Sequence, residues 1–236
     1  MVHHIGIVAC SAEGAALCYR TICHEGEALL GGHGHPEVSL HGNSLEAYSI
    51  RLDADDWAGV GDLMLDSANK LAAGGADLLV CPDNTCHKAL PFIVDRSPAP
   101  WLHIAEVVAS SAADRGFRRV GILGTRWLVD SDVYPDKLTA VGIEAVRPQS
   151  PERDELQRII MDELVRGVFE PEAIAFHQRL IDRLRVEEGC DAVVLGCTEI
   201  PLIIDDTNSS LPTLDSTRLL ARAAVERTLE TGTAPM

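Results

Sequence analysis

The sequence predicts an α/β fold in which parallel β-sheets carry helices on both faces. Short apolar runs alternate with longer helical patterns along the 236 residues, and this alternation is typical of βαβ units. Some runs, such as residues 76–81, are continuously apolar, as expected for strands that are buried on both faces. Three runs end in small polar residues, and ligands of open α/β sheets bind outside the carboxyl ends of the strands.

The first half of the chain begins with a strand and a helix. Ser11 and the small residues after it offer a helix start behind the first strand. Apolar residues at mostly helical spacing predict a helix over residues 54–74, which Gly74 and Gly75 end. A further helix is expected over residues 84–94. The strands of this half are expected at residues 3–10, 37–42, 76–81 and 101–105.

The second half repeats the same pattern. Two helices are expected to fill residues 151–188, with Gly167 as the weak point between them. The remaining helices are expected at residues 106–116, 127–141, 199–204 and 217–231, and the strands at residues 119–125, 143–148, 191–197 and 211–216.

Composition narrows the class of protein. No run approaches the roughly 18 apolar residues of a membrane helix, and residues 1–10 lack the basic and apolar segments of a secretion signal. We therefore expect a cytoplasmic protein that does not bind membranes. Seven cysteines in a chain of this length favour reduced thiols over a disulfide framework. The formal net charge of −16 argues against nucleic acid as a partner, and it means that an anionic substrate needs a local cationic pocket.

Cys197 stands between a buried-strand run and the predicted helix 199–204. The dipole at a helix N-terminus stabilises a thiolate and lowers the pKa of the thiol, so we predict a functional role for Cys197. Packing as a small buried side chain is the alternative. Thr198 and Glu199 fit the first helical turn, although the Glu199 carboxylate is expected to oppose thiolate formation in part.

Residues 81–87 hold a second group of candidates, namely Cys81, Asp83, Cys86 and His87. Zinc is considered because cysteine and histidine are its usual ligands, but no second cluster of the usual spacing accompanies them. We therefore predict no metal site. Asp83 is suited to cap the helix that starts at Asn84. An aspartate at such a position is common and does not require a catalytic role.

Two stretches resemble the motifs of the aspartate/glutamate racemase superfamily. Asp83-Asn84-Thr85-Cys86-His87 is similar to its C-N-T-x-H motif, and Gly196-Cys197-Thr198-Glu199 matches its G-C-T-E motif. The likeness also covers residues 102–107, 122–127 and 211–217. It implies two Rossmann-like lobes with parallel sheets related by a pseudo-twofold axis, with the active site in the interlobe cleft. Lobe 1 would hold residues 1–99 plus 208–236, and lobe 2 residues 100–207.

The resemblance also implies an activity. The chain would be a cofactor-independent racemase or epimerase of an aspartate- or glutamate-like amino acid, and would form a homodimer. One catalytic group removes the α-proton and another returns a proton from the opposite face. Cys197 would be one of them. Asp83 occupies the position of the family's first catalytic cysteine; it is a weaker base than a thiolate, but burial could raise its pKa enough to make it a proton donor.

Two other thiols are alternatives to Asp83. Cys10 ends the first strand and Cys86 follows Asp83 by about one helical turn. Both are ranked below Asp83, because a shift of one turn moves an acid/base group by several ångströms.

A small-molecule carboxylate is the expected substrate. Arg126 and Arg166 are the charged candidates for holding a distal carboxylate, and a surface salt bridge is the alternative role for each. The residues predicted to bind substrate are Ser11, Asn84, Thr85, Thr125, Thr198 and Arg166.

Two other functions stay open on the same scaffold. One is a single-cysteine decarboxylase or isomerase, similar to arylmalonate decarboxylase, maleate isomerase or hydantoin racemase. The other is a ligand-binding relative without catalysis. The intact motif at Cys197 argues against the second alternative, and the altered motif at Asp83 argues for it.

Overall fold

The structure is a computed structural model that describes residues 4–230. The chain divides into two compact units. The first unit comprises residues 4–104 and 217–230, and the second unit comprises residues 105–216. Each unit contains its own sheet. Among residues 4–230, no helix has both the length and the apolar character that crossing a membrane requires.

The first unit contains a four-stranded parallel sheet with the order β2-β1-β3-β4. Its strands are β1 (His4–Ala9), β2 (Glu37–Gly42), β3 (Leu78–Val80) and β4 (Trp101–Leu102). β1 is central and buried at every position, whereas the edge strand β2 consists of exposed and half-buried residues. The continuous apolar run of β1 is therefore explained by cover on both faces.

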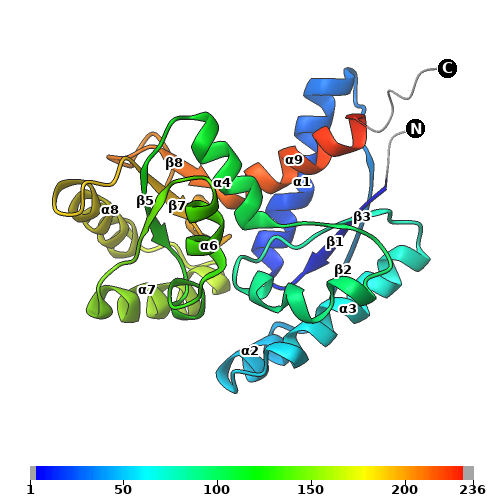
Figure 1. The fold of residues 1–236 in the computed structure, drawn as a ribbon, viewed down its shortest axis with the longest axis horizontal. Coiled ribbons are helices and arrows are strands. Elements are labelled where there is room, and N and C mark those ends of the chain that lie inside the picture. The colour runs from blue at the N-terminus through cyan, green and yellow to red at the C-terminus, as the bar shows by residue number, and fades with distance from the viewer. Residues whose placement is uncertain (1–3, 231–236) are drawn as a thin grey trace. The chain divides into compact units, whose positions relative to one another are not determined.

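Helices cover this sheet on both sides (Figure 1). Right-handed crossovers between parallel strands place α1 on one face and α3 with the 3₁₀ helix η1 on the other. The helices are α1 (Ala12–Leu30), α2 (Leu45–Asp53), α3 (Trp57–Ala73), η1 (Thr85–Phe92), η2 (Val94–Arg96) and α9 (Ser216–Glu230). Arg222 of α9 pairs with Glu25 of α1 at 2.7 Å, which ties the end of the described chain to its beginning.

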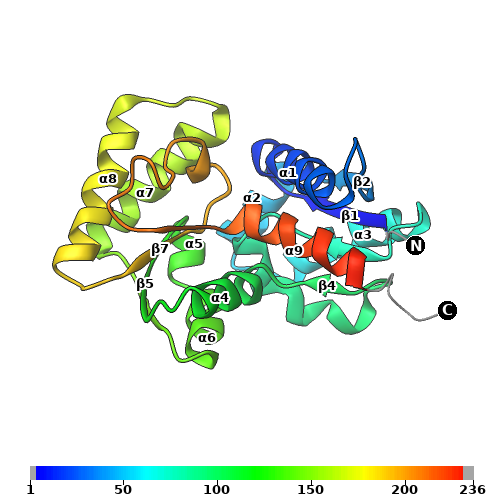
Figure 2. The same cartoon turned by 90° about the horizontal axis from the view of Figure 1, so that it is seen from above.

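The second unit repeats the strand order of the first, as β6-β5-β7-β8. Its strands are β5 (Arg119–Leu123), β6 (Glu144–Val146), β7 (Ala192–Leu195) and β8 (Thr213–Asp215). Its helices are α4 (Ile104–Asp114), α5 (Arg126–Val129), α6 (Val133–Ala140), α7 (Ser150–Asp162), η3 (Leu164–Arg166), α8 (Pro171–Val186) and η4 (Ile200–Leu202). Figure 2 shows α7 and α8 on one side of β5 and β7, with α4 and α6 on the other.

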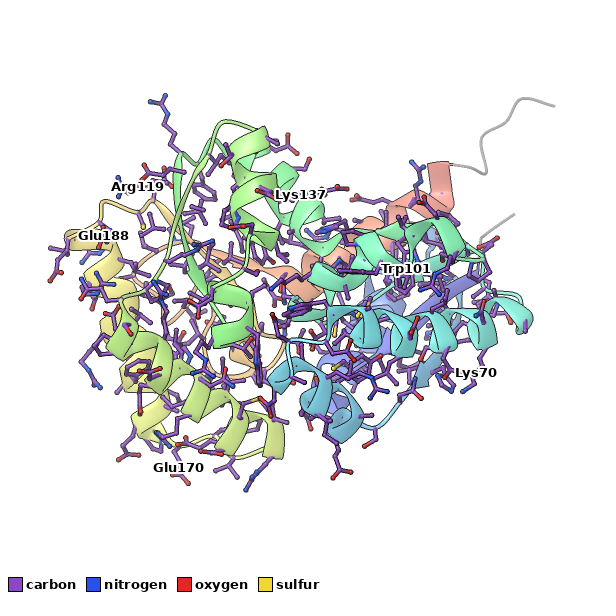
Figure 3. All side chains as sticks on the ribbon, turned by 60° about the horizontal axis from the view of Figure 1, so that its bottom comes forward. Lys70, Trp101, Arg119, Lys137, Glu170 and Glu188 are labelled. Carbon is purple, nitrogen blue, oxygen red and sulfur yellow. The ribbon has the colours of Figure 1, made fainter. Side chains whose placement is uncertain are left out.

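The two edges of the second sheet differ in chemistry. At the amino end of β5, Arg119 pairs with Glu144 at 3.2 Å and with Glu188 at 3.7 Å; Arg119 and Glu188 are labelled together in Figure 3. The carboxyl ends of β5 and β7 instead lead into buried small and polar residues, among them Thr125 and Cys197. The carboxyl edge is the one at which ligands of parallel α/β sheets bind.

The predicted α/β class is confirmed by the two parallel sheets. The structure differs from the predicted elements at several places. The helix α2 was not predicted, and the helix expected over residues 127–141 is divided into α5 and α6. Residues 84–94 and 199–204 form 3₁₀ helices; Pro91 lies inside the first of these, where it removes a backbone donor. Residues 3 and 231 of the expected elements lie outside the described part.

Strand pairing decides where the units divide. The sequence-based division placed residues 100–104 in lobe 2 and residues 208–216 in lobe 1. In the structure β4 pairs with β3, and β8 pairs with β7. β4 therefore belongs to the first sheet, and the helix that follows it, α4, belongs to the second unit. In the same way β8 belongs to the second sheet, and α9, which follows it, belongs to the first unit.

Candidate functional site

The carboxyl end of β7 is packed tightly against β5. The Gly196 N–H donates to the Leu123 carbonyl at 2.7 Å. A Cβ atom at Gly196 would lie 2.7 Å from that same oxygen and 2.7 Å from Leu128 Cδ2. Only glycine fits this approach without movement of the strands. The close approach of Gly196 to β5 therefore fixes the position of Cys197, the next residue in the chain.

Cys197 lies in a buried hydrogen-bonded group with the two residues that follow it. The Cys197 thiol donates to Glu199 Oε2 at 2.9 Å, and the Thr198 hydroxyl donates to the same oxygen at 3.1 Å. The exposed fractions are 8% for Cys197, 3% for Thr198 and 2% for Glu199. A carboxylate buried this far needs hydrogen-bond donors, and the thiol and the hydroxyl supply two.

This geometry gives the thiol a proton acceptor. In this hydrogen bond the thiol is the donor and the Glu199 carboxylate is the acceptor. Transfer of the thiol proton to Glu199 would leave a thiolate, as an adjacent base does in other activated thiols. The expectation that the Glu199 carboxylate opposes thiolate formation in part stays a prediction.

The predicted helix behind Cys197 is a 3₁₀ turn of three residues, Ile200–Leu202. So short a turn has too few aligned peptide dipoles to stabilise a thiolate as a full helix does. The structure therefore does not supply the helix dipole that the sequence predicts at Cys197, and the polar group next to the thiol is the Glu199 carboxylate.

Thr125 stands at the carboxyl end of the neighbouring strand β5. A Cβ atom at Gly124, the residue before it, would lie 3.1 Å from the Gly196 carbonyl, so the two strand ends are in contact. The Thr125 hydroxyl accepts the Leu128 N–H at 3.3 Å and caps α5. Thr125 is thus brought to the same sheet edge as Cys197, where its hydroxyl also has a structural role.

The two candidate arginines are exposed. Arg126 follows Thr125, and its backbone N–H donates to Gln157 Oε1 at 2.9 Å. Arg166 lies in η3, and its side chain is exposed. Neither geometry identifies a partner for a distal carboxylate, so this role stays a prediction.

In the first unit, three candidate acid/base groups converge. Cys10 follows β1, while Asp83 and Cys86 follow β3. One ligand atom from each of the three side chains lies within 4.8 Å of the others. Asp83 is half-buried, and its Oδ1 accepts the Cys86 N–H at 3.0 Å. This bond is the helix cap that the sequence predicts for Asp83.

The two thiols of this cluster hold their protons firmly. The hydrogen bond with Cys86 lowers the pKa of Cys10, but burial and the charges of Asp83 and Cys81 outweigh it and raise that pKa to about 12. Hydrogen bonds with Cys10 and Cys81, and then burial, raise the pKa of Cys86 well above its ordinary value. Both groups are therefore protonated near neutral pH, which makes them poor bases.

The predicted binding residues of the first unit are buried at the same sheet edge. Ser11 caps α1 by accepting the Gly14 N–H at 3.2 Å. Asn84 and Thr85 begin η1 and are 2% and 7% exposed. Their backbone positions follow β1 and β3, the same strands that carry the thiol cluster.

His87 has a structural role that the sequence did not reveal. Its Nε2 donates to the Cys81 carbonyl at 3.0 Å, and its Nδ1 accepts the Ile104 N–H at 3.4 Å. Burial, and next to it the neighbouring His103, lower the pKa of His87 to about 3. A neutral imidazole therefore holds the end of β3 to the start of α4.

Comparisons with known proteins agree with these motifs. A match to the Asp/Glu/hydantoin racemase family covers residues 7–224. The broad specificity amino-acid racemase RacX of Bacillus subtilis strain 168 is 26% identical over 194 residues, which cover 81% of each chain. A glutamate racemase of Thermus thermophilus is 29% identical over 168 residues, which cover 69% of this chain and 59% of that protein.

The fold comparison gives the same result. The crystal structure of an aspartate racemase homologue from Pyrococcus horikoshii OT3 matches with a TM-score of 0.83 at 28% identity, covering 97% of this chain and 100% of that chain. The family match extends over both units and both motif regions. The chain therefore belongs to the Asp/Glu/hydantoin racemase family.

Proposed function

We propose that the protein is a cofactor-independent racemase or epimerase of an amino acid, with Cys197 and Asp83 as its two acid/base groups. The observation that carries the proposal is the hydrogen bond from the Cys197 thiol to the buried carboxylate of Glu199. A thiol with a built-in proton acceptor can become the base that a carbon acid requires. The names of the relatives in this family support the same reaction class.

The proton steps balance in both directions. Cys197 passes its proton to Glu199, and the thiolate then takes the α-proton of the substrate to form an S–H bond and a carbanion. Protonated Asp83 gives its proton to the opposite face of that carbanion. Asp83 is then a carboxylate and Glu199 holds a proton. The reverse reaction starts at the Asp83 carboxylate, Cys197 gives its proton to the carbanion, and Glu199 returns a proton to the thiolate. Between turnovers in one direction, Glu199 releases a proton to water and Asp83 takes one up.

Asp83 and Cys197 occupy equivalent places in the two units. Asp83 follows β3, the third strand of the first unit, and Cys197 follows β7, the third strand of the second. The order of strands is the same in both sheets. This equivalence supports a pair of groups with matching roles.

The substrate that we propose is a small amino acid with an aspartate- or glutamate-like carboxylate. Backbone and hydroxyl donors at the strand ends, among them Thr198, Asn84 and Thr85, would bind the α-carboxylate and so stabilise the carbanion. From the resemblance we also propose a homodimer, which analytical ultracentrifugation would test.

The direct test is hydrogen exchange at the α-carbon. The protein is incubated in heavy water with a panel of L- and D-amino acids, and proton NMR follows each α-proton signal. We expect exchange accompanied by loss of optical rotation for at least one member of the panel. Cys197→Ala should abolish both signals, and Cys190→Ala, which removes a buried thiol elsewhere in the second unit, should retain both. Absence of exchange with every amino acid would refute the proposal.

One observation favours a second candidate, a decarboxylase or isomerase that uses Cys197 alone. The Asp83 carboxylate already has a structural role, because it accepts the Cys86 N–H. Asp83→Asn keeps an acceptor oxygen for that N–H but cannot transfer a proton. The two-base racemase should lose racemisation in Asp83→Asn, whereas a single-cysteine enzyme should keep most of its turnover.

A further inference from the structure

We propose that Cys10, Asp83 and Cys86 form a binding site for a thiophilic divalent cation, with Zn²⁺ as the expected ion. This site lies in the first unit and shares Asp83 with the two-base reaction proposed above, but it does not involve Cys197. It also reverses the expectation of no metal site, which considered only the spacing within residues 81–87.

The three donor atoms already have the separation that such an ion requires. The sulfur atoms of Cys10 and Cys86 and a carboxylate oxygen of Asp83 lie within 4.8 Å of one another. Around a tetrahedral zinc ion with Zn–S bonds of about 2.3 Å, ligand atoms are about 3.8 Å apart. The side chains therefore need to move by an ångström or less to contact one ion.

Adjacent strands hold the donors in place. Cys10 follows β1 and the other two follow β3, and these strands pair directly through Ile7 and Val80. The bond from the Cys86 N–H to Asp83 Oδ1 fixes two of the ligands relative to each other. A site supported by paired strands and a backbone hydrogen bond costs little reorganisation when the ion binds.

Tyr48 gives a second, independent indication. Its side chain is fully buried, and its hydroxyl has no hydrogen-bond partner within the described chain. Burial raises the pKa of Tyr48, and the charges of Cys86, Cys81, Cys10 and Asp83 raise it further. The phenol therefore keeps its proton, and it lies near enough to the cluster to interact with it electrostatically. An unsatisfied buried hydroxyl is costly, and a carboxylate or thiolate bound to a metal ion would accept a hydrogen bond from it.

The chemistry of the donor set suits a soft or borderline cation. Two cysteines and one carboxylate are ligands of zinc, and three protein ligands leave a fourth position for water. Binding would release the two thiol protons, because only thiolates ligate the ion. Asp83 could not hold a metal ion and transfer a proton at the same time, so the ion would block the two-base reaction.

The test measures binding of the metal itself. Reduced, metal-free protein competes for Zn²⁺ with a chromophoric chelator, and Co²⁺ is added in a separate titration to report the ligands. We expect one equivalent of Zn²⁺ and a Co²⁺ spectrum with thiolate charge transfer and tetrahedral d–d bands. Since loss of one outer partner typically costs 10- to 100-fold in affinity, loss of the ligand in Cys86→Ser should weaken Zn²⁺ binding by about 100-fold or more.

Matched variants separate this site from other thiols and from misfolding. Cys18→Ser alters another fully buried cysteine of the same unit and should bind Zn²⁺ like the parent protein. Asp83→Asn preserves shape and should also weaken binding, and Tyr48→Phe should weaken it by about 10-fold. Circular dichroism before metal addition checks that each variant is folded.

The proposal fails if Cys10→Ser, Cys86→Ser and Asp83→Asn all bind Zn²⁺ as tightly as Cys18→Ser. It also fails if the Co²⁺ spectrum shows no thiolate ligand. Cys197→Ala should bind Zn²⁺ normally even though it is expected to lose α-proton exchange, so the failure of one proposal is distinguishable from that of the other.

Discussion

Glu199 is the residue whose role changes most between sequence and structure. Its carboxylate is buried and accepts hydrogen bonds from both Cys197 and Thr198. Glu199→Gln keeps the size of the side chain but removes the acceptor that forms the thiolate. We expect kcat for α-proton exchange to fall by about 10²- to 10⁴-fold, the usual contribution of a general base, with a much smaller change in KM. Steady-state kinetics measure both.

Glu172→Gln is the control for this variant, because Glu172 is exposed in α8 of the same unit. It should leave kcat unchanged. Equal activity of Glu199→Gln and the parent protein would mean that the thiol is activated by another group.

His87 makes the stability of the first unit depend on pH. Its pKa falls from the ordinary 6.5 to about 3, because the imidazole is buried. The folded protein therefore binds fewer protons than the unfolded chain, and this contribution to stability is complete above pH 6.5 and declines as the pH falls toward 3. Each pH unit in that window costs about 1.4 kcal/mol.

The measurement is urea unfolding at pH 6.5 and pH 5. Between these values the parent protein should lose about 2 kcal/mol more of its free energy of unfolding than His87→Asn does. His24→Asn, at an exposed position of α1, should behave like the parent. The same pH response in parent and His87→Asn would contradict a buried neutral imidazole.

At the scale of the elements, the junction of β5 and β7 depends on Gly196. A methyl group there would collide with the Leu123 carbonyl, so Gly196→Ala should destabilise the protein by about 1–3 kcal/mol. It should also displace Cys197 and lower kcat by about 10- to 100-fold. Thermal unfolding and kinetics on the same samples test the two effects.

Gly6→Ala provides the comparison in β1. Its added methyl group would lie 2.9 Å from both Ala76 Cβ and Leu79 Cδ2, so a similar loss of stability is expected. Gly6 does not precede a catalytic candidate, and its kcat should change much less. If both variants lose activity equally, lowered stability and not the position of Cys197 explains the loss.

Much of the element pattern could be predicted from hydrophobic periodicity. β2 has the predicted bounds, and the break at Gly167 is a left-handed residue between η3 and α8. Periodicity could not identify α2, which is short and buries only Tyr48 and Leu52. It also could not distinguish an α-helix from the 3₁₀ helices after β3 and β7. Over one or two turns, a short α-helix and a 3₁₀ helix each show only a few apolar residues, so their spacing does not separate the two.

The candidate site was predictable only where its residues are consecutive. Cys197 was identified from its place after a strand, and Glu199 is two residues away, so the adjacent carboxylate was a signal available in the sequence. The group formed by Cys10, Asp83 and Cys86 needs a contact between residues more than 70 positions apart. Strand order, which linear spacing does not contain, creates that contact.

At the scale of the whole molecule, the second unit is one continuous segment. A hydrophobic core of this unit, which includes Leu156, Ile181 and Val193, is formed entirely by residues between 105 and 216. We therefore expect the fragment 105–216 to fold alone and to unfold cooperatively, since a compact unit with its own core behaves as a domain. Thermal unfolding followed by circular dichroism tests this.

The fragment 1–104 is the matched comparison. It lacks α9, which contributes the fully buried Leu220, Ala221 and Val225, and it should show no cooperative transition. Cooperative unfolding of 1–104 alone would show that α9 is dispensable for the first unit.

The ion pair between Arg222 and Glu25 joins residues 197 positions apart, and this separation has a consequence for synthesis on the ribosome. The chain of the first unit is interrupted after residue 104, and its last helix follows residue 216. At ~5–20 residues per second, translation of the intervening segment takes roughly 6 to 22 s. During that interval the second unit has time to fold, while the nascent first unit still exposes the apolar surface that α9 later covers. Chaperone binding to the nascent chain is therefore expected over this window and should end once α9 has left the exit tunnel.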